Sequence, residues 1–282
     1  MTLLKRFLRR IVYAVPGAQV LWVELNRMLG REGRRSFSGW GMVTEALPPW
    51  HDGGDDAFAR DFVKVHDEVV ERVAGGQIKL SQFNDVQDKV WKLRELRWRH
   101  YFVFWSARYA SRAAGGSVTH LVECGVCDGL TAYFAMSAVK DSGPFRAFLY
   151  DAWEGMKTER LLDSEQSATD SYSYLSLDNT QQNLAPFKGE TVFVKGFIPE
   201  SFNTSEKPST VTWLHVDLNS ALPTAAALQV LFDKVSPGGI ILFDDYGWGD
   251  YRDTKLAVDR FVDGQPGALL PLPTGQAMFF KH

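Results

Sequence analysis

The feature that most constrains the fold is the run from Leu121 to Gly129, which reads Leu-Val-Glu-Cys-Gly-Val-Cys-Asp-Gly. Its apolar start is typical of a buried strand ending at Glu123, and the glycines that follow predict a tight turn into a helix from about Thr131. Such a Glu-x-Gly-x-x-x-Gly loop occurs in nucleotide-binding α/β sheets, where it lets the backbone approach a ligand at a helix N-terminus. A tight strand–helix turn needs glycine with or without a ligand, so the loop alone leaves both interpretations open.

Beyond Ser117, short apolar runs alternate with helical patterns, which is typical of a doubly wound, Rossmann-like α/β sheet. The runs expected to form its parallel strands are 120–124, 146–151, 191–195, 212–217 and 239–244. Helices are expected between them, including 225–235 and 255–262. The last two runs, 268–272 and 277–281, predict a C-terminal hairpin that contributes an antiparallel strand.

Residues 1–112 are expected to form a mostly helical N-terminal extension or lid, and residues 113–282 the sheet domain. Apolar residues at helical spacing predict helices over 55–74 and 81–110. The first 23 residues combine basic side chains with an apolar stretch. We expect a packing or homo-oligomer helix there, with a peripheral contact to a membrane surface as the alternative. No run reaches the roughly twenty apolar residues of a transmembrane helix, and a signal peptide is not expected.

The composition narrows the classes of function. A net charge of −3 gives no general attraction to nucleic acid. Cys124 and Cys127 are the only cysteines, so a disulfide-built secreted domain is not expected and we place the protein in the cytoplasm. A zinc site needs about four ligands, and no second pair has a matching spacing. A redox dithiol stays open, although both cysteines lie inside the glycine loop, where small residues are expected for packing.

Acidic residues stand where the expected strands end. The first strand ends at Glu123, the second at Asp151, the fourth at Asp217 and the fifth at Asp244 and Asp245. Ligands of open parallel sheets bind beyond the carboxyl ends of the strands. Acids that share one edge repel each other, so this edge requires a compensating cation or hydrogen-bond donors.

Asp151 ends the strand that follows the glycine loop. An acidic residue at this place can accept hydrogen bonds from the hydroxyls of a ribose. The alternative is an N-cap for a helix after Ala152. The upstream loop favours the ribose role.

Asp217, Asp244 and Asp245 follow two strands that are expected to be neighbours. Their carboxylates are hard oxygen ligands of the kind that suits Mg²⁺. A bound cation can fix a substrate hydroxyl and lower its pKa, so that it attacks as an alkoxide. The alternative is a capping pair with one solvated acid.

Several segments of the chain together resemble a known enzyme family. The chain from about Val118 to Lys281 resembles the macrocin/mycinamicin/novobiocin-type (TylF-like) O-methyltransferases, which depend on S-adenosylmethionine. The matching segments are 122–129, 150–156, 214–217, 236–247 and 272–276. The resemblance implies a class I methyltransferase sheet. It places Glu123, Gly125 and Gly129 in the loop under the methionine part of the cofactor and Asp151 at the ribose. It further implies that Asp217, Asp244 and Asp245 bind a divalent metal ion.

One departure from the family pattern concerns the proton acceptor. The family has Asp-x-Asp after the fourth strand, whereas this chain has Asp217, Leu218 and Asn219. An amide cannot take up the proton of a hydroxyl. Either metal coordination alone activates the hydroxyl, with Asp217 as the first catalytic candidate, or another group serves as the base. His215, two residues before Asp217 on the same side of the strand, is the second candidate. A partly buried strand histidine without a catalytic role is the more common case; Tyr246 and His51 are further candidates for the base.

The resulting hypothesis is a Mg²⁺-assisted transfer of the methyl group of S-adenosylmethionine to a hydroxyl of a sugar or glycosylated small molecule; the resemblance implies the sugar. A nicotinamide-dependent oxidoreductase is the first alternative, but it normally requires Gly-x-Gly-x-x-Gly, and Cys127 departs from that pattern. A non-catalytic binding protein is the second alternative, which Asn219 keeps open.

Overall fold

A seven-stranded sheet forms the centre of the computed structural model, which describes residues 59–115, 118–204 and 207–282. The strands lie in the order β3-β2-β1-β4-β5-β7-β6. β1 to β5 run parallel, and β7 runs antiparallel to both β5 and β6. Their bounds are β1 (Thr119–Cys124), β2 (Phe145–Asp151), β3 (Thr191–Lys195), β4 (Val211–Val216), β5 (Val235–Phe243), β6 (Gly267–Pro271) and β7 (Ala277–Lys281). The predicted fold class, including the terminal hairpin, is confirmed.

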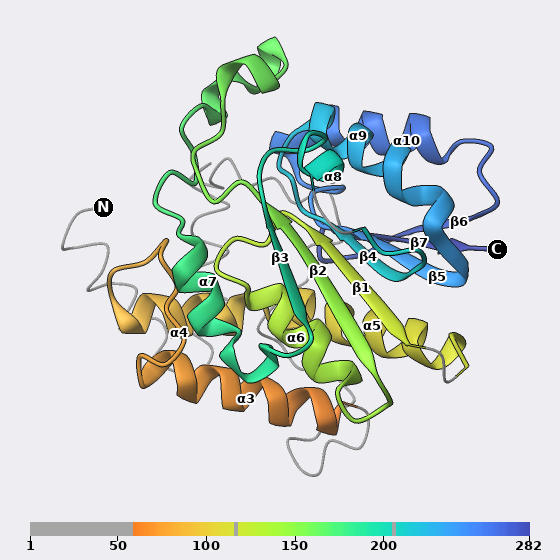
Figure 1. Cartoon of the computed structure of the whole chain (residues 1–282). Coiled ribbons are helices and arrows are strands. Elements are labelled where there is room, and N and C mark those ends of the chain that lie inside the picture. Colours follow the sequence, from red (N-terminus) through yellow and green to blue (C-terminus); the bar gives the residue numbers. More distant parts are fainter. Residues whose placement is uncertain (1–58, 116–117, 205–206) are drawn as a thin grey trace, which may run out of the picture. The chain divides into compact units, whose positions relative to one another are not determined.

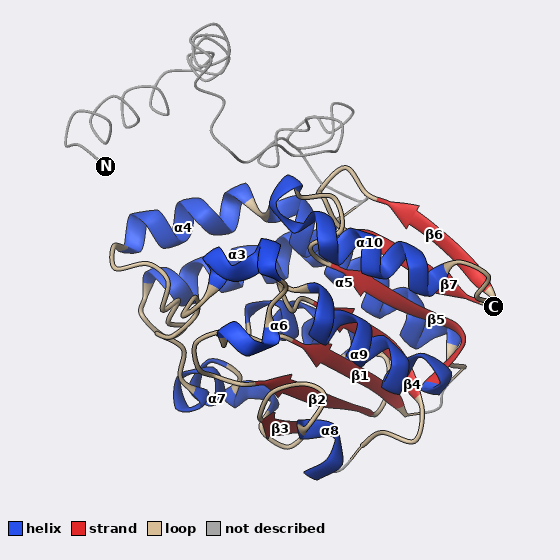
Figure 2. Cartoon of the chain, turned by 90° about the horizontal axis from the view of Figure 1, so that it is seen from above, coloured by secondary structure: helices blue, strands red, loops and turns tan. Residues whose placement is uncertain are grey.

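Helices cover both faces of this sheet (Figure 1). One face carries α3 (Arg60–Ala74), α4 (Val86–Glu95), α5 (Arg97–Ala113), α6 (Leu130–Val139) and α7 (Leu177–Asn183). The other face carries α8 (Ser201–Thr204), α9 (Ala221–Leu231) and α10 (Arg252–Val262). Short 3₁₀ turns lie at Thr158–Arg160, Asp163–Ala168, Ala185–Phe187, Phe232–Lys234 and Gly249–Tyr251. Figure 2 shows the sheet and its helices from above.

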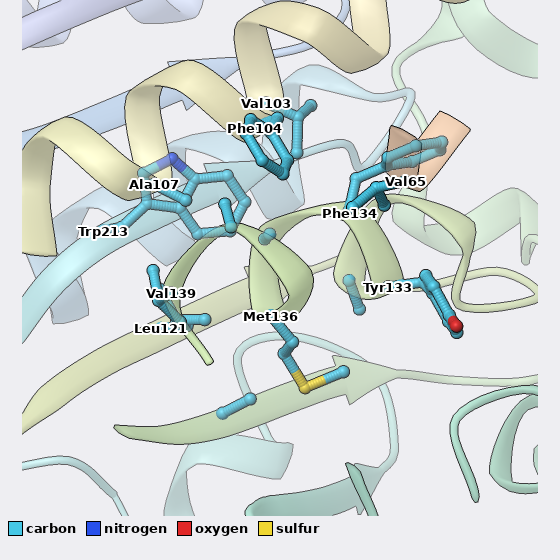
Figure 3. Packing of buried hydrophobic residues seen from close by; sticks show 14 of the residues in the cluster. Val65, Val103, Phe104, Ala107, Leu121, Tyr133, Phe134, Met136, Val139 and Trp213 are labelled. Carbon is cyan, nitrogen blue, oxygen red and sulfur yellow. The ribbon is translucent and has the colours of Figure 1, made fainter. Parts of the chain in front are cut away.

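Alternating side chains assign each strand residue to one of two cores. Leu121 and Trp213 point toward α5 and α6, whereas Val122 and Leu214 point toward the α9 side. Figure 3 shows the first core, in which Trp213 of β4 lies beside Ala107 of α5, and Phe134 of α6 lies beside Val65 of α3. Full burial of such a side chain stabilises the fold by about 1.5–3 kcal/mol. The strands are therefore apolar on both faces, which explains why their sequences read as continuous apolar runs.

Helix α5 runs antiparallel to the central strands. Near its C-terminal end, Ser111 hydrogen-bonds Thr119 at the start of β1 (2.8 Å). Midway along the helix, Ser106 accepts a hydrogen bond from the Trp213 indole of β4 (2.8 Å). The first turn of α5 consequently lies beyond the carboxyl ends of the strands, where ligands of such sheets bind.

Several expected boundaries differ from the structure. The single helix expected over 81–110 is two helices that meet at Leu96. The first begins only at Val86, because Asp85 accepts hydrogen bonds from the amides of Gln87 and Asp88. The helix expected over 225–235 is α9, four residues earlier, and β5 begins where that helix was expected to end.

Some expectations fall outside the described residues, namely those on the first 23 residues and on His51. Among the described helices, none is both long and apolar enough to cross a bilayer. The described part of the expected N-terminal extension, α3 to α5, shares the core of α6 and the sheet. A lid role for residues 1–112, and their separation from 113–282, stay predictions.

Candidate active site

Most of the predicted site residues lie in one row that runs across the strands at their carboxyl ends. Glu123 of β1 pairs with Leu149 of β2 and with His215 of β4, and His215 pairs with Leu242 of β5. Two residues further along each chain, this register places Asp151, Gly125, Asp217 and Asp244 at the edge, on the side that faces α5 and α6. Asp217 and Asp244 therefore come from neighbouring strands, as expected.

Gly125 and Gly129 are glycines because the chain packs tightly against itself at both positions. Gly125 has φ +90°, and a Cβ there would lie 1.8 Å from the carbonyl oxygen of Asp217. Gly129 has φ +83° at the start of α6, where a Cβ would lie 2.9 Å from Cδ1 of Leu184. Internal packing alone requires both residues, so their contact with a cofactor stays a prediction.

Asp151 fixes the shape of the glycine loop. Its Oδ2 accepts hydrogen bonds from the amides of Val126 (2.7 Å) and Cys127 (2.9 Å), and its Oδ1 from the amide of Trp153 (2.6 Å). No helix begins after Ala152, so the N-cap alternative does not apply. Burial raises the pKa of Asp151, and these backbone donors oppose that shift. The carboxylate retains acceptor capacity for a further donor.

A second carboxylate, Asp128, ties the glycine loop to the helical layer. It accepts hydrogen bonds from the amide (2.6 Å) and hydroxyl (2.7 Å) of Ser81 and from Nδ2 of Asn179 (2.8 Å). The sequence reasoning did not identify this anchor, because its partners are far apart in the chain.

Burial raises the pKa of the Cys124 and Cys127 thiols, so the reactive thiolate form is disfavoured at both positions.

Glu123 and His215 form a hydrogen-bonded pair inside the protein. Oε1 of Glu123 lies 2.9 Å from Nδ1 of His215, and both side chains are buried. Burial, followed by the charges of Asp217 and Asp151, raises the pKa of Glu123 well above its usual value. Burial and Arg99 lower the pKa of His215 to about 3. Both groups therefore favour their neutral forms, and the pair lies behind the edge carboxylates.

Asp217 and Asp245 are neighbouring carboxyl groups, and the charge of Asp217 disfavours ionisation of Asp245. The Asn219 amide N–H donates to Oδ2 of Asp245 (3.0 Å), and the Asn219 side chain donates to Oδ1 of Asp217 (3.2 Å). Burial, then the charge of Asp217, raises the pKa of Asp245 well above its usual value. Asn219 thus orders the two carboxyl groups and also accepts a hydrogen bond from Tyr172 (3.0 Å).

Asp244 is held by two residues that the sequence reasoning did not identify. Gln276 donates from Nε2 to Oδ1 of Asp244 (2.9 Å), and Thr274 in turn donates to Gln276 (2.9 Å). Arg99, from the first turn of α5, donates from Nε to Oδ1 of Asp244 (2.8 Å). Its Nη2 contacts Oδ2 of Asp244 and lies 3.4 Å from Oδ2 of Asp217. A helical projection could have found Arg99, because it shares a helix face with buried Val103.

The expected metal set is only partly brought together. Ligand atoms of His215, Asp217 and Asp244 lie within 4.8 Å of one another, but Asp245 does not belong to this group. The Arg99 guanidinium already lies between the carboxylates of Asp217 and Asp244. A divalent ion therefore does not fit among these residues as they stand. Tyr246 donates to Asp259 (2.6 Å) and accepts from Lys255 (3.1 Å), so its hydroxyl is engaged by α10.

The comparisons with known proteins add the chemistry of the domain. Residues 122–246 match a family described as a methyltransferase domain. No curated protein matches the sequence. The solved O-methyltransferase NovP is similar, at 19% identity and a TM-score of 0.57, over 65% of this chain and 79% of NovP. The calicheamicin methyltransferase CalS11 is 17% identical with a TM-score of 0.51, over 86% of this chain and 98% of CalS11.

These likenesses concern the fold of the methyltransferase domain. Its strand order and its similarity to NovP and CalS11 give it the class I sheet of S-adenosylmethionine-dependent methyltransferases. The glycine loop, Asp151 and the acidic cluster all lie at the carboxyl edge of this sheet. A methyl donor and an acceptor would have to meet at this edge.

Proposed function

We propose that the chain is an S-adenosylmethionine-dependent O-methyltransferase of the TylF-like kind, acting on a hydroxyl of a sugar or glycosylated small molecule. The observation that carries the proposal is the convergence of the glycine loop, Asp151 and Asp217 at one sheet edge within a methyltransferase domain. The motif resemblance of residues 118–281 supports the sugar. The expected cytoplasmic location belongs to the same proposal, and homo-oligomer formation stays a prediction.

The cofactor would bind over the glycine loop. Asp151 already orders this loop through two backbone amides and would hold the ribose hydroxyls with its remaining acceptor capacity. Gly125 and Gly129 keep the backbone free of side chains there, and Glu123 presents a buried Oε2 without a hydrogen-bond partner among the described residues. Such an atom can accept a donor such as the amino group of the methionine part.

The proposed reaction is a single displacement. The acceptor oxygen forms a bond to the methyl carbon while the carbon–sulfur bond breaks, and its electron pair stays on sulfur to give S-adenosylhomocysteine. The hydroxyl proton passes to the carboxylate of Asp217. Burial raises the pKa of Asp217, which makes it a stronger base, and Arg99 opposes that shift. The chain otherwise contributes alignment of donor and acceptor. The Mg²⁺ expected from the sequence has no step in this scheme, because Arg99 lies between Asp217 and Asp244.

Two alternatives differ in what they bind. A nicotinamide-dependent oxidoreductase would normally need the loop pattern Gly-x-Gly-x-x-Gly. This chain has Cys127 at the second glycine of that pattern. A non-catalytic protein would bind the cofactor without turnover, and Asn219 in place of an acid is the feature that supports it.

Isothermal titration with S-adenosylhomocysteine and with NADH tests the binding step. The proposal expects one molecule of S-adenosylhomocysteine per chain and no binding of NADH; the reverse result would establish the oxidoreductase alternative. Methyl transfer from radiolabelled S-adenosylmethionine to a panel of free, nucleotide-linked and glycoside sugars then tests the reaction. Binding without transfer to any member of the panel would favour the non-catalytic protein.

A further inference from the structure

We propose that Arg99 is the resident cation of this active site and takes the place of a divalent metal ion between Asp217 and Asp244. The inference rests on the proposed function for the role of the site, but the occupancy of the site can be measured without turnover. It concerns a residue from outside the segments that resemble the methyltransferase family, since Arg99 lies in α5.

Arg99 contacts both of the acids that a metal ion would bind. Its Nε donates to Oδ1 of Asp244 at 2.8 Å, and its Nη2 contacts Oδ2 of the same carboxylate. The same Nη2 donates to Oδ2 of Asp217 at 3.4 Å. One hydrogen bond to Asp244 and ion-pair contacts with both acids therefore place the guanidinium against the two carboxylates.

Helix packing fixes Arg99 in this place. On the same helix, Val103 and Ala107 are buried in the core below the sheet, and Ser106 accepts the hydrogen bond of the Trp213 indole. His100, the next residue, stacks on Phe134 of α6 with ring centroids 4.5 Å apart. The backbone of the first turn is therefore held on two sides. Gln276, the residue before β7, donates a hydrogen bond to the partner of Arg99, Asp244.

A metal ion and this guanidinium exclude each other. An ion bound to Asp217 and Asp244 would lie about 2.1 Å from oxygens of each carboxylate. Nη2 of Arg99 already lies in contact distance of oxygens of both residues, so the ion would overlap it and meet its positive charge. Metal binding would require Arg99 to leave, which would break its ion pairs with both acids.

Exposure indicates which part of the cluster an acceptor can reach. The side chains of Arg99 and Asp217 are 24% and 21% exposed, whereas that of Asp244 is 2% exposed. Asp244 thus anchors the cation from inside, and Arg99 and Asp217 together face the accessible side. An acceptor hydroxyl there would meet a positive donor and a carboxylate at once, which are the two charges needed to hold its oxygen and take its proton.

The decisive measurement is Mn²⁺ binding, followed by the loss of the free-ion electron paramagnetic resonance signal, on chelator-treated protein. The wild type is expected to bind weakly. Arg99→Ala removes the cation and is expected to bind Mn²⁺ at least about tenfold more tightly, because the two carboxylates lose their partner. Arg99→Lys keeps a positive charge and is expected to bind as weakly as the wild type. Arg108→Ala, on the same helix but paired with the exposed Asp61, is the matched control and is expected to match the wild type.

Tight, stoichiometric Mn²⁺ binding by the wild type would overturn the proposal, whether or not Arg99→Ala can be compared with it. Methyl transfer provides a second readout: the wild type is expected to keep its rate in EDTA, and loss of the rate with recovery in Mg²⁺ would also overturn it. If Arg99→Ala does not fold, the wild-type Mn²⁺ titration still decides. A protein that fails to bind S-adenosylhomocysteine but shows the Mn²⁺ contrast would refute the proposed function and retain the role of Arg99.

Discussion

At the scale of single residues, Asp217 combines three influences in one carboxyl group. Burial raises its pKa, and the guanidinium of Arg99 and the neighbouring Asp245 lower it. Burial and the charge of Asp217 raise the pKa of Asp245 well above the usual value, so the protonated form is favoured at Asp245 and the negative charge at Asp217. Asp217 therefore combines the ionised form that a base needs with a pKa closer to neutral than that of an exposed aspartate.

Asp217→Asn tests this assignment with an isosteric change. The amide cannot accept the proton, so methyl transfer is expected to fall by about 10²–10⁴-fold, the usual contribution of a general base. Binding of S-adenosylhomocysteine is expected to change little. Asp233→Asn, at an exposed position remote from the edge, is the control. Equal rates for wild type and Asp217→Asn would remove Asp217 as the base.

Gly125 gives a prediction about stability that needs no ligand. An added Cβ would meet the Asp217 carbonyl oxygen at 1.8 Å, and the positive φ adds backbone strain. Gly125→Ala is expected to lower the free energy of unfolding by more than about 3 kcal/mol. The control is Gly76→Ala, where φ is +72° and no atom lies within 4 Å, so only strain of about 1 kcal/mol applies. Urea denaturation measures both, and similar losses would contradict the steric argument.

At the scale of elements, the segment between β2 and α7 is braced against the other side of the sheet edge. Glu165 in this segment accepts hydrogen bonds from the amide of Ala221 (2.8 Å) and the hydroxyl of Ser220 (2.8 Å). These groups form the N-terminus of α9, so a carboxylate from another segment acts as the cap of this helix. Arg160 extends the brace by a two-point ion pair with Glu200.

Removing this cap is expected to loosen the segment. Glu165→Ala is expected to lower the free energy of unfolding by about 1–2 kcal/mol, since it leaves the amide of Ala221 and the hydroxyl of Ser220 without their charged acceptor. Limited proteolysis is expected to cut first between residues 154 and 176. Glu159→Ala, an exposed residue of the same segment, is expected to change stability by less than about 0.5 kcal/mol. Unchanged cleavage in Glu165→Ala would show that the brace does not hold the segment.

The sequence was informative where the chemistry follows strand register. Strand ends and side-chain alternation predicted the meeting of Asp151, Asp217 and Asp244, because parallel neighbours place their carboxyl ends on one edge. The glycine loop and the terminal hairpin were also recognisable, because each depends on a local sequence pattern. Asp245 was grouped with Asp244 because the two are adjacent and because the family resemblance implies both, although adjacent residues at the end of a strand need not point to the same side.

Contacts between distant elements were not predictable in this way. Arg99 reaches the edge because α5 packs antiparallel to β4, and nothing local to 97–113 states which strand it will meet. Gln276 meets Asp244 only because β7 inserts between β5 and β6. The start of α9 was misplaced because its cap, Glu165, belongs to another segment of the chain. Each miss concerns a tertiary partner rather than a local propensity.

At the scale of the whole molecule, buried titratable groups pull stability in opposite directions with pH. Burial is the main cause that lowers the pKa values of His66, His100 and His215. The folded protein therefore loses stability as pH falls below about 6.5, because the unfolded chain takes up protons there. Glu123 and Asp245 have their pKa raised by burial. Their protonated forms favour folding, so they contribute stability at low pH that is lost as pH rises through the raised pKa. The dependence of wild-type stability on pH is expected to be the sum of these two opposing contributions.

A variant at His100 separates one side of this sum. His100 is buried against Phe134, and its Nδ1 has no hydrogen-bond partner among the described residues. His100→Gln removes the titration but also the stacking, so the variant is expected to be less stable than the wild type at pH 8. Below the unfolded value of 6.5, the wild type alone pays for keeping this imidazole neutral. The gap in free energy of unfolding should therefore narrow by up to about 1.4 kcal/mol per pH unit. Urea denaturation of both proteins at several pH values from 8 down to 5 measures it. A constant or widening gap would show that the folded protein protonates His100, and that the core around α5 admits a charge beside Arg99.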